Sequence, residues 1–282
     1  MKAFFVSIIL STTLVVHSQY YYTDIMSAKE LSKLQASYIT NKVKTITATG
    51  TDKSGVKASD FSEYHEVKEN GSLLRVVKMN GLTKTITTYQ FNTAGKLVTI
   101  TDSTAAVQNH TTYVYDNAGY ISKVENKVTD ADGSFSQTEV HSWQYASNGK
   151  PLKMWRSFDG INSNDSMEVQ FIIDENGNIG EEKTYKRGKE AGFLYYYYDE
   201  KNQLSDIVRY NTKLKKLLPD IMFEYDEVGN IVQKITTTSS QSMGYLIWRY
   251  IFNERGLKTR EALFNNNKQL TGRIDFKYTF EK

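Results

Sequence analysis

The acidic residues that could do chemistry occur in pairs, at Asp174-Glu175, Asp199-Glu200 and Asp226-Glu227. Two carboxylates about 5–10 Å apart are the arrangement that glycoside hydrolysis needs. Each of these pairs, however, is followed at the same offset by a Gly or an Asn, and the arrangement recurs along the chain. A catalytic pair is needed only once. We therefore interpret the pairs as solvent-facing turns, and the sequence predicts that the protein is not an enzyme.

Residues that bind metals or act as nucleophiles are sparse. The chain has no Cys, and His65, His110 and His141 are isolated, without the paired spacing of zinc motifs. The string that begins at Asp130 reads DADG, which lacks the remaining ligands of a calcium loop. There is no Gly-x-Ser-x-Gly elbow. The sequence therefore predicts no metal and no cofactor, with structural or surface roles for these histidines.

Aromatic residues are the other chemical signal, and the densest cluster is YYYYDE at residues 195–200. In a strand, Tyr196 and Tyr198 point to one face while Tyr195 and Tyr197 point to the other. Rings on the outer face of an exported sheet are able to stack on sugars or contact a partner. Packing against neighbouring strands is the alternative interpretation, and the sequence leaves both open.

These rings belong to a repeat, typified by YVYDNAGYI at 113–121 and FEYDEVGNI at 223–231. We call the residue before the Asp or Asn position zero. It falls at Val67, Phe91, Tyr115, Tyr145, Ile173, Tyr198, Tyr225 and Phe252. An Asp or Asn at +1 opens a type I turn, and the Gly at +4, which is Asn202 in one copy, takes positive φ. Each copy therefore predicts a hairpin in which position zero faces a Leu or Ile at +6.

Second turns between the copies, such as Asn80-Gly81, Asp132-Gly133 and Arg187-Gly188, complete each repeat as two strands. Eight repeats give about 16 strands in an antiparallel up-and-down meander, with a last strand at 274–280. We predict an all-β fold from about 43 to 280, curled or closed like a barrel, because so many rings cannot stay wet. We also expect positive φ at Gly229 but not at Gly188.

Residues 27–39, SAKELSKLQASYI, break the β pattern. Ser27 and Glu30 resemble a capping box, and Leu31, Leu34 and Tyr38 follow at helical spacing. The segment predicts an amphipathic helix over about 27–41. We expect it to pack on one end or edge of the sheet, as a cap of the repeat array or as a movable lid.

The N-terminus, MKAFFVSIILSTTLVVHSQ, is typical of a secretory signal peptide with cleavage before Gln19. The predicted organisation is a signal peptide at 1–18, a segment with the helix at 19–42 and a β-hairpin repeat domain at 43–282. The protein is expected to be exported, periplasmic or extracellular, without a transmembrane helix in the mature chain. The net charge of +3, without a basic stripe, predicts no nucleic-acid partner.

The pattern Tyr-x-Tyr-Asp-x-x-Gly-x-Ile resembles the Tyr-Asp (YD) repeats of the Rhs and teneurin families, from about Phe61 to the end of the chain. In those families such repeats build spiralling β-sheet shells around a cargo or toxin. This chain is short and lacks the Arg that usually follows the motif Gly. It is more similar to small exported bacterial repeat proteins of unknown function, some with a porin-like meander. That resemblance brings no catalytic or binding residues.

Three functions remain open. The first is an exported, non-enzymatic binding or scaffold protein, whose candidate partners are a glycan, a lipid or a surface protein. The second is a carrier of an amphipathic or apolar ligand in a lumen lined by Tyr113, Tyr115, Tyr196, Tyr198, Tyr225 and Tyr250. The third is an outer-membrane β-barrel. Against the third, we place the charged residues at +8 and +10, such as Lys123 and Glu125, on the ring-bearing face, where lipid would make them costly.

Overall fold

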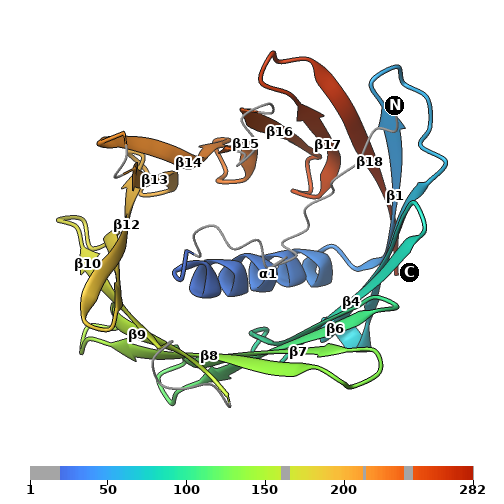
Figure 1. The fold of residues 1–282 in the computed structure, drawn as a ribbon. Coiled ribbons are helices and arrows are strands. Elements are labelled where there is room, and N and C mark those ends of the chain that lie inside the picture. Colours follow the sequence, from blue (N-terminus) through green and yellow to red (C-terminus); the bar gives the residue numbers. More distant parts are fainter. Residues whose placement is uncertain (1–19, 160–165, 212–213, 238–243, 282) are drawn as a thin grey trace.

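The fold is a closed antiparallel β-barrel with one α-helix inside it, as the computed structural model shows (Figure 1). The structure describes residues 20–159, 166–211, 214–237 and 244–281. The predicted signal peptide, residues 1–18, lies outside the described residues. The prediction of an all-β, barrel-like fold with a single N-terminal helix is confirmed.

The chain begins with the helix and then runs through the strands in order. The helix α1 is Thr23–Thr40, and a short 3-10 turn, η1, is Glu69–Gly71. The strands are β1 Val43–Asp52, β2 Phe61–Lys68, β3 Leu73–Asn80, β4 Thr83–Phe91, β5 Leu97–Ser103, β6 Val107–Tyr115, β7 Ile121–Asp130, β8 Ser136–Tyr145, β9 Pro151–Phe158, β10 Met167–Ile173, β11 Ile179–Lys186, β12 Lys189–Tyr198, β13 Leu204–Asn211, β14 Lys216–Tyr225, β15 Ile231–Thr237, β16 Tyr245–Phe252, β17 Lys258–Phe264 and β18 Leu270–Phe280.

Every strand pairs antiparallel with the next, and β18 pairs with β1 to close the sheet. The barrel has 18 strands, two more than the repeats alone predict. The eight motif hairpins supply the strands from β2 to β17, while β1 and β18 flank them and form the seam. At this seam the hydroxyls of Thr45 and Thr279 lie 2.6 Å apart, although the residues are 234 positions apart in sequence. Closure leaves no free edge strand to pair with another molecule.

The predicted motif hairpin is confirmed in seven of the eight copies, whereas Val67 pairs with Leu74, one residue beyond +6. Position zero pairs with +6 in seven copies, for example Tyr115 with Ile121 and Tyr225 with Ile231. The +4 glycines have positive φ, and Asn202 takes the same conformation with φ 58. The expectation for Gly188 was wrong, because this residue has φ 71. Arg187 precedes it with φ 53, so the second turn between β11 and β12 also needs two left-handed residues.

A β-bulge next to seven of the eight motif turns decides which side chains face inward. Tyr115 pairs with Ile121, but its neighbour Val114 pairs with Lys123 rather than with Ser122. The extra residue shifts the alternation by one position. Lys123 and Glu125 at +8 and +10 therefore face outward, and our placement of them on the ring-bearing face was wrong. Val124 at +9 faces inward and is buried.

The helix begins at Thr23, four residues before the predicted start, so Ser27 is not its N-cap. The Ser27 hydroxyl instead lies 3.2 Å from that of Thr23, one turn earlier. The buried residues of α1 follow helical spacing and form one face. They are Ile25, Ser27, Ala28, Leu31, Gln35 and Tyr38.

The helix lies inside the ring of strands and not on an outer edge (Figure 1). Its buried face joins wall residues such as Tyr89, Trp143 and Tyr196 in one core cluster. A barrel of this size leaves an interior that its own wall side chains do not fill. The helix supplies the missing apolar surface.

Candidate functional site

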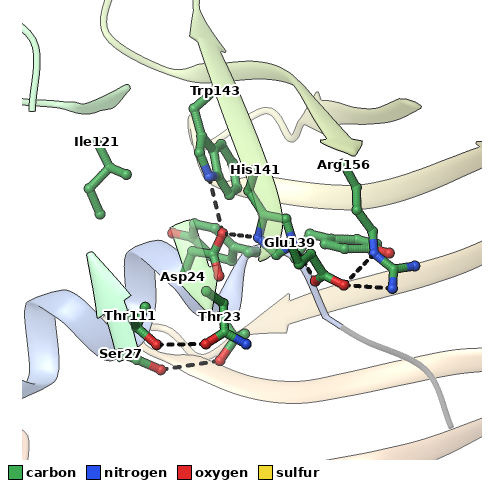
Figure 2. A network of polar contacts seen from close by, with 12 residues as sticks. Thr23, Asp24, Ser27, Thr111, Ile121, Glu139, His141, Trp143 and Arg156 are labelled. Carbon is green, nitrogen blue, oxygen red and sulfur yellow. Dashed lines mark hydrogen bonds and ion pairs between the residues drawn. The ribbon is translucent and has the colours of Figure 1, made fainter. Parts of the chain in front are cut away.

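A chain of charged groups connects the helix to the barrel wall (Figure 2). Asp24, in the first turn of α1, accepts a hydrogen bond from the indole of Trp143 at 3.1 Å and lies 2.7 Å from Nδ1 of His141. On the other side of the ring, Nε2 of His141 lies 2.8 Å from Glu139. The guanidinium of Arg156 donates to the remaining oxygen of Glu139 at 2.7 and 2.9 Å. Both nitrogens of His141 therefore have carboxylate partners.

The neighbouring side chains of this network shift one another's pKa values. Burial alone would lower the pKa of His141, but the carboxylates of Asp24 and Glu139 outweigh it and raise that pKa to about 9. Burial raises the pKa of Glu139, but the hydrogen bonds from His141 and Arg156 outweigh burial and lower the pKa to about 2. At neutral pH His141 is thus an imidazolium, and the carboxylate of Glu139 lies between it and the guanidinium of Arg156.

Glu182 is the most deeply buried charged residue of the wall, at 1% exposure. One carboxylate oxygen accepts the backbone N–H of Tyr21 at 3.1 Å. The other accepts the N–H of Tyr22 at 3.1 Å and the hydroxyl of Tyr196 at 2.7 Å. These donors are neutral, and burial raises the pKa of Glu182 to about 7. The carboxyl group fixes the chain just before the helix begins, where the helix dipole also favours negative charge.

Other interior charges are paired in the same way. Nε2 of His65 lies 2.6 Å from Glu63, and Lys258 lies 2.8 Å from Glu261. The hydroxyl of Tyr20 donates to Asp220 at 3.0 Å, and Arg209 also binds Asp220. His65 and His141, which the sequence analysis treated as structural or surface residues, are both buried in the wall.

The C-terminal half of the helix is tied to the motif turns at one end of the barrel. Gln35 donates to the carbonyl of Gly71 at 3.0 Å, and the N–H of Leu97 donates to the Ser32 hydroxyl at 3.2 Å. Asn41 reaches the carbonyl of Arg255 at 3.3 Å. Together with the N-terminal contacts, these bonds attach the helix to the wall at its start and in its C-terminal half.

The six tyrosines proposed to line a lumen have different surroundings. Tyr113 and Tyr196 are buried in the core cluster with the helix. Tyr115 and Tyr198 are partly buried and pack against that cluster. Tyr225 and Tyr250 are also half-buried, and the ammonium of Lys258 lies 5.3 Å from the ring of Tyr250. As predicted, Tyr196 points inward while Tyr197 is exposed.

The position-zero tyrosines share a contact that the sequence analysis missed. Each hydroxyl donates to the carbonyl of the +6 residue in the preceding motif copy. The pairs are Tyr115 with Leu97, Tyr145 with Ile121, Tyr198 with Ile179 and Tyr225 with Leu204, at 2.7–3.0 Å, and Tyr278 of β18 reaches Lys258 in the same way. These bonds explain why a ring with a hydroxyl recurs at this position, since it connects successive hairpins.

The acidic residues of the motif turns bind their own backbone. The carboxylate of Asp226 accepts the N–H groups of Val228 and Asn230 at 3.1 and 2.8 Å. Asp174 and Asp199 make the same pair of bonds in their turns. Within the described ranges no three His, Asp or Glu side chains group in a way that would hold a metal ion. The interpretation of these residues as turn formers is therefore supported by their contacts.

A shallow groove of about 320 Å³ lies where the end of the helix meets the first motif turns. It is lined by Gln35, Ala36, Ile39, Thr40, Asn70, Ser72, Asn92, Thr93 and Gly95. The lining consists of amide, hydroxyl and aliphatic groups and includes no ionisable side chain.

Alternation along the strands was the signal that could have located the interior network. Glu139 and His141 precede Trp143 at steps of two, so they share the inward face of a ring residue that the motif already identifies. Asp24 and Glu182 had no such signal. The helix start was misplaced, and the bulge before Glu182 shifts the alternation.

Comparisons with known proteins give no family and no curated relative, since no family model and no curated protein matches this chain. Among solved structures, a porin-like protein from Bacteroides uniformis aligns over 84% of this chain and 98% of its own, with 12% identity and a TM-score of 0.43. A porin-like protein from Bacteroides vulgatus covers the same shares with 13% identity and a TM-score of 0.27. A Tc holotoxin pore from Photorhabdus luminescens covers 86% of this chain and 17% of its own, with 11% identity and a TM-score of 0.32.

In the described part of the chain, no helix combines the length and apolar character that crossing a bilayer requires.

Proposed function

We propose that this protein is an exported, non-enzymatic β-barrel that acts as a binding or scaffold module, with α1 as a fixed internal plug. The observation that carries the proposal is the pairing at His141. Asp24 occupies Nδ1 and Glu139 occupies Nε2, so neither nitrogen faces a position where a substrate could exchange a proton. The polar groups best placed for chemistry hold the helix in place instead.

The residues on the outer face of the barrel favour a protein surrounded by water over one embedded in lipid. Outward-facing Lys and Glu form ion pairs on neighbouring positions, such as Lys123 with Glu125 at 2.9 Å and Lys153 with Glu168 at 2.8 Å. A Lys at the middle of a bilayer costs about 2–4 kcal/mol. An outer-membrane barrel would place such residues against lipid. A difference in detergent-gel migration between unheated and heated protein would favour the outer-membrane alternative.

A screen of purified protein against glycosidase, esterase and peptidase substrates tests the absence of catalysis. We expect that no substrate is turned over in a way that depends on a single side chain of the protein. Asp226→Asn should fold and behave like the parent, since Asn occupies the same motif position at Asn92 and Asn253. Turnover that is lost in His141→Gln or Asp226→Asn would contradict the proposal.

As a second proposal, the protein carries an amphipathic or apolar ligand in its lumen, and one observation supports this. The side chains of Arg209 and Asp220 face the interior, yet they are 33% and 17% exposed, so solvent reaches this part of the wall. A guest with polar and apolar parts would suit the charged pair together with the tyrosine rings of the inner face. Native mass spectrometry of protein purified from its own host tests this. A bound lipid or glycan that is lost in Tyr198→Ala supports the proposal, and a bare protein mass opposes it.

The relation to Tyr-Asp repeat proteins is likewise a proposal. It is supported by the motif hairpins, the positive φ at +4 and the tyrosine bonds between successive copies.

A further inference from the structure

The two ends of the barrel differ in chemistry. Motif turns form one end and carry the acidic pairs described above, such as Asp199-Glu200 and Asp226-Glu227. The second turns form the opposite end, because the strands of a meander alternate in direction. We call this opposite end the basic rim, for the residues Lys84, Lys186, Arg187, Lys189, Lys215 and Lys216.

Positive charge is concentrated on two neighbouring hairpins of the basic rim. Lys186 and Lys189 are cross-strand partners beside the β11–β12 turn, with Arg187 between them. Lys215 and Lys216 follow at the β13–β14 turn, and β12 pairs with β13, so the two turns are adjacent. Among the described residues of these two turns, the cations outnumber the one acidic residue, Glu190, so this part of the rim carries net positive charge.

Apolar side chains project from the same turns. Leu214 is 60% exposed, held at the tip by a bond from its N–H to the Asn211 side chain at 2.9 Å. Leu217 is 47% exposed and pairs with the exposed Tyr210. Across the barrel, Leu82 is fully exposed two residues before Lys84. An exposed leucine next to a lysine thus occurs on both the β3–β4 turn and the β13–β14 turn, which lie on opposite sides of the barrel.

We propose that the basic rim docks on the surface of an anionic lipid membrane, with Leu214, Leu217 and Leu82 inserted among the headgroups. Residues on opposite sides of a barrel mouth reach one partner together only when that partner is broad and flat, as a bilayer is. Lysines attract anionic headgroups, and leucines add apolar burial. The β7–β8 turn carries Asp130 and Asp132, so docking centres on the β11–β14 side.

The acidic motif-turn end reinforces this orientation, since an anionic surface repels it. The protein would therefore stand on the membrane with the helix-bound end directed into water. The inference concerns the outer rim and does not depend on whether the interior binds a ligand.

Co-sedimentation with lipid vesicles tests the inference. The sample is the protein in the form that an expression host exports. The probes are vesicles of phosphatidylcholine alone and vesicles with about 30% phosphatidylglycerol. We expect binding to the anionic vesicles only, and weaker binding at high salt. Two double variants, Leu214→Ser with Leu217→Ser and Lys215→Glu with Lys216→Glu, should each weaken binding by about tenfold or more. Val228→Ser is the matched control, because Val228 is 79% exposed at the opposite, acidic end.

Three results would overturn the inference. Absence of binding to anionic vesicles would point to a protein partner or to none. Equal binding by the parent and both double variants would show adsorption elsewhere on the molecule. Binding that is lost with the lysines but kept without the leucines would show surface attraction without insertion. Circular dichroism of each variant confirms that the barrel is folded.

Discussion

Individual hydroxyl and carboxyl groups explain much of why this barrel holds together. The motif tyrosine uses its ring for the core and its hydroxyl for the neighbouring hairpin. The interior carboxylates have partners from the helix or from adjacent strands. Polar groups enter this interior because each finds a defined partner there, which is the condition for burying them at low cost.

Tyr145→Phe should lower the free energy of unfolding by about 1 kcal/mol, the typical value of one hydrogen bond. The reason is that the variant keeps the ring but loses the 2.9 Å bond from the hydroxyl to the carbonyl of Ile121. Urea denaturation measures the change. Tyr197→Phe is the control, since that ring is exposed on the outer face. An equal loss in both variants would show that the inter-hairpin bond contributes nothing specific.

Glu182 should make stability depend on pH. Its pKa rises from 4.5 in the ordinary state to about 7 in the folded protein because of burial. The folded protein therefore holds a proton that the unfolded chain releases between these values. Stability from this group is fully present below about pH 4.5 and is lost as pH rises through about 7.

Glu182→Gln tests this dependence, because the amide does not titrate. The stability of the parent relative to the variant should fall as pH rises from about 4.5 to about 8, by about 1.4 kcal/mol for each unit of pKa shift. Denaturation curves at several pH values measure it. Parallel stability profiles would contradict the assignment.

At the scale of elements, the helix and the motif turn each depend on a few residues. The helix is held at its start by Asp24, Tyr21 and Tyr22 and near its end by Gln35 and Asn41. The turn depends on a backbone that only Gly or Asn adopts without strain.

Removing the contacts of His141 with Asp24 and Glu139 should release the helix from the wall while the barrel stays folded. His141→Leu leaves the carboxylates of Asp24 and Glu139 facing each other without the imidazolium between them. Removing one partner of a buried ionic cluster costs about 3–5 kcal/mol.

The chain has no Cys, so Ala28→Cys on the buried helix face provides a unique thiol probe. Its labelling should accelerate by about a hundredfold or more in the His141→Leu background, since each 1.4 kcal/mol is tenfold, while far-ultraviolet dichroism stays β-rich. Ala28→Cys with Tyr197→Phe, which keeps His141, serves as the control. Unchanged labelling would show that the network does not hold the helix.

Gly229→Ala should destabilise the protein by about 1 kcal/mol or more, because Gly229 has φ 84 in its motif turn. Gly192→Ala is the appropriate control. This strand glycine has ordinary φ and open space around it, so Ala should be neutral or slightly stabilising there. Thermal unfolding of both variants measures the contrast. Equal effects would mean that the turn does not require the left-handed conformation.

At the scale of the whole molecule, closure joins the two ends of the chain. The β1–β18 seam forms only when the whole meander has curved through a full circle, so it is the most non-local contact of the fold.

A disulfide across the seam tests closure. In the double variant Thr45→Cys with Thr279→Cys, the thiols replace hydroxyls that lie 2.6 Å apart. The bond should form on oxidation and stabilise the protein by about 4–5 kcal/mol, because it closes a very long loop. Thr45→Cys with Thr101→Cys, which are not cross-strand partners, should form no bond. Failure of the seam pair to oxidise would favour an open sheet.

Local patterns in the amino-acid sequence were enough to predict the local structure of this protein. Turn residues at fixed offsets identify the hairpins, since an Asp or Asn and a left-handed Gly specify one turn geometry wherever they occur. The alternation around Tyr196 correctly separated inward from outward rings. The extent of the meander, from about 43 to 280, also followed from local patterns, as β1 and β18 confirm.

Features that depend on residues far apart in the sequence became visible only in the folded barrel. The pairing of β1 with β18, the position of the helix inside the ring and the contacts of Asp24 with His141 and Trp143 join residues more than a hundred positions apart. The outward direction of Lys123 followed from a bulge that hydrophobic alternation does not reveal. Such features are set by curvature and by complementary charge across the lumen. Periodicity along one strand carries no information about either.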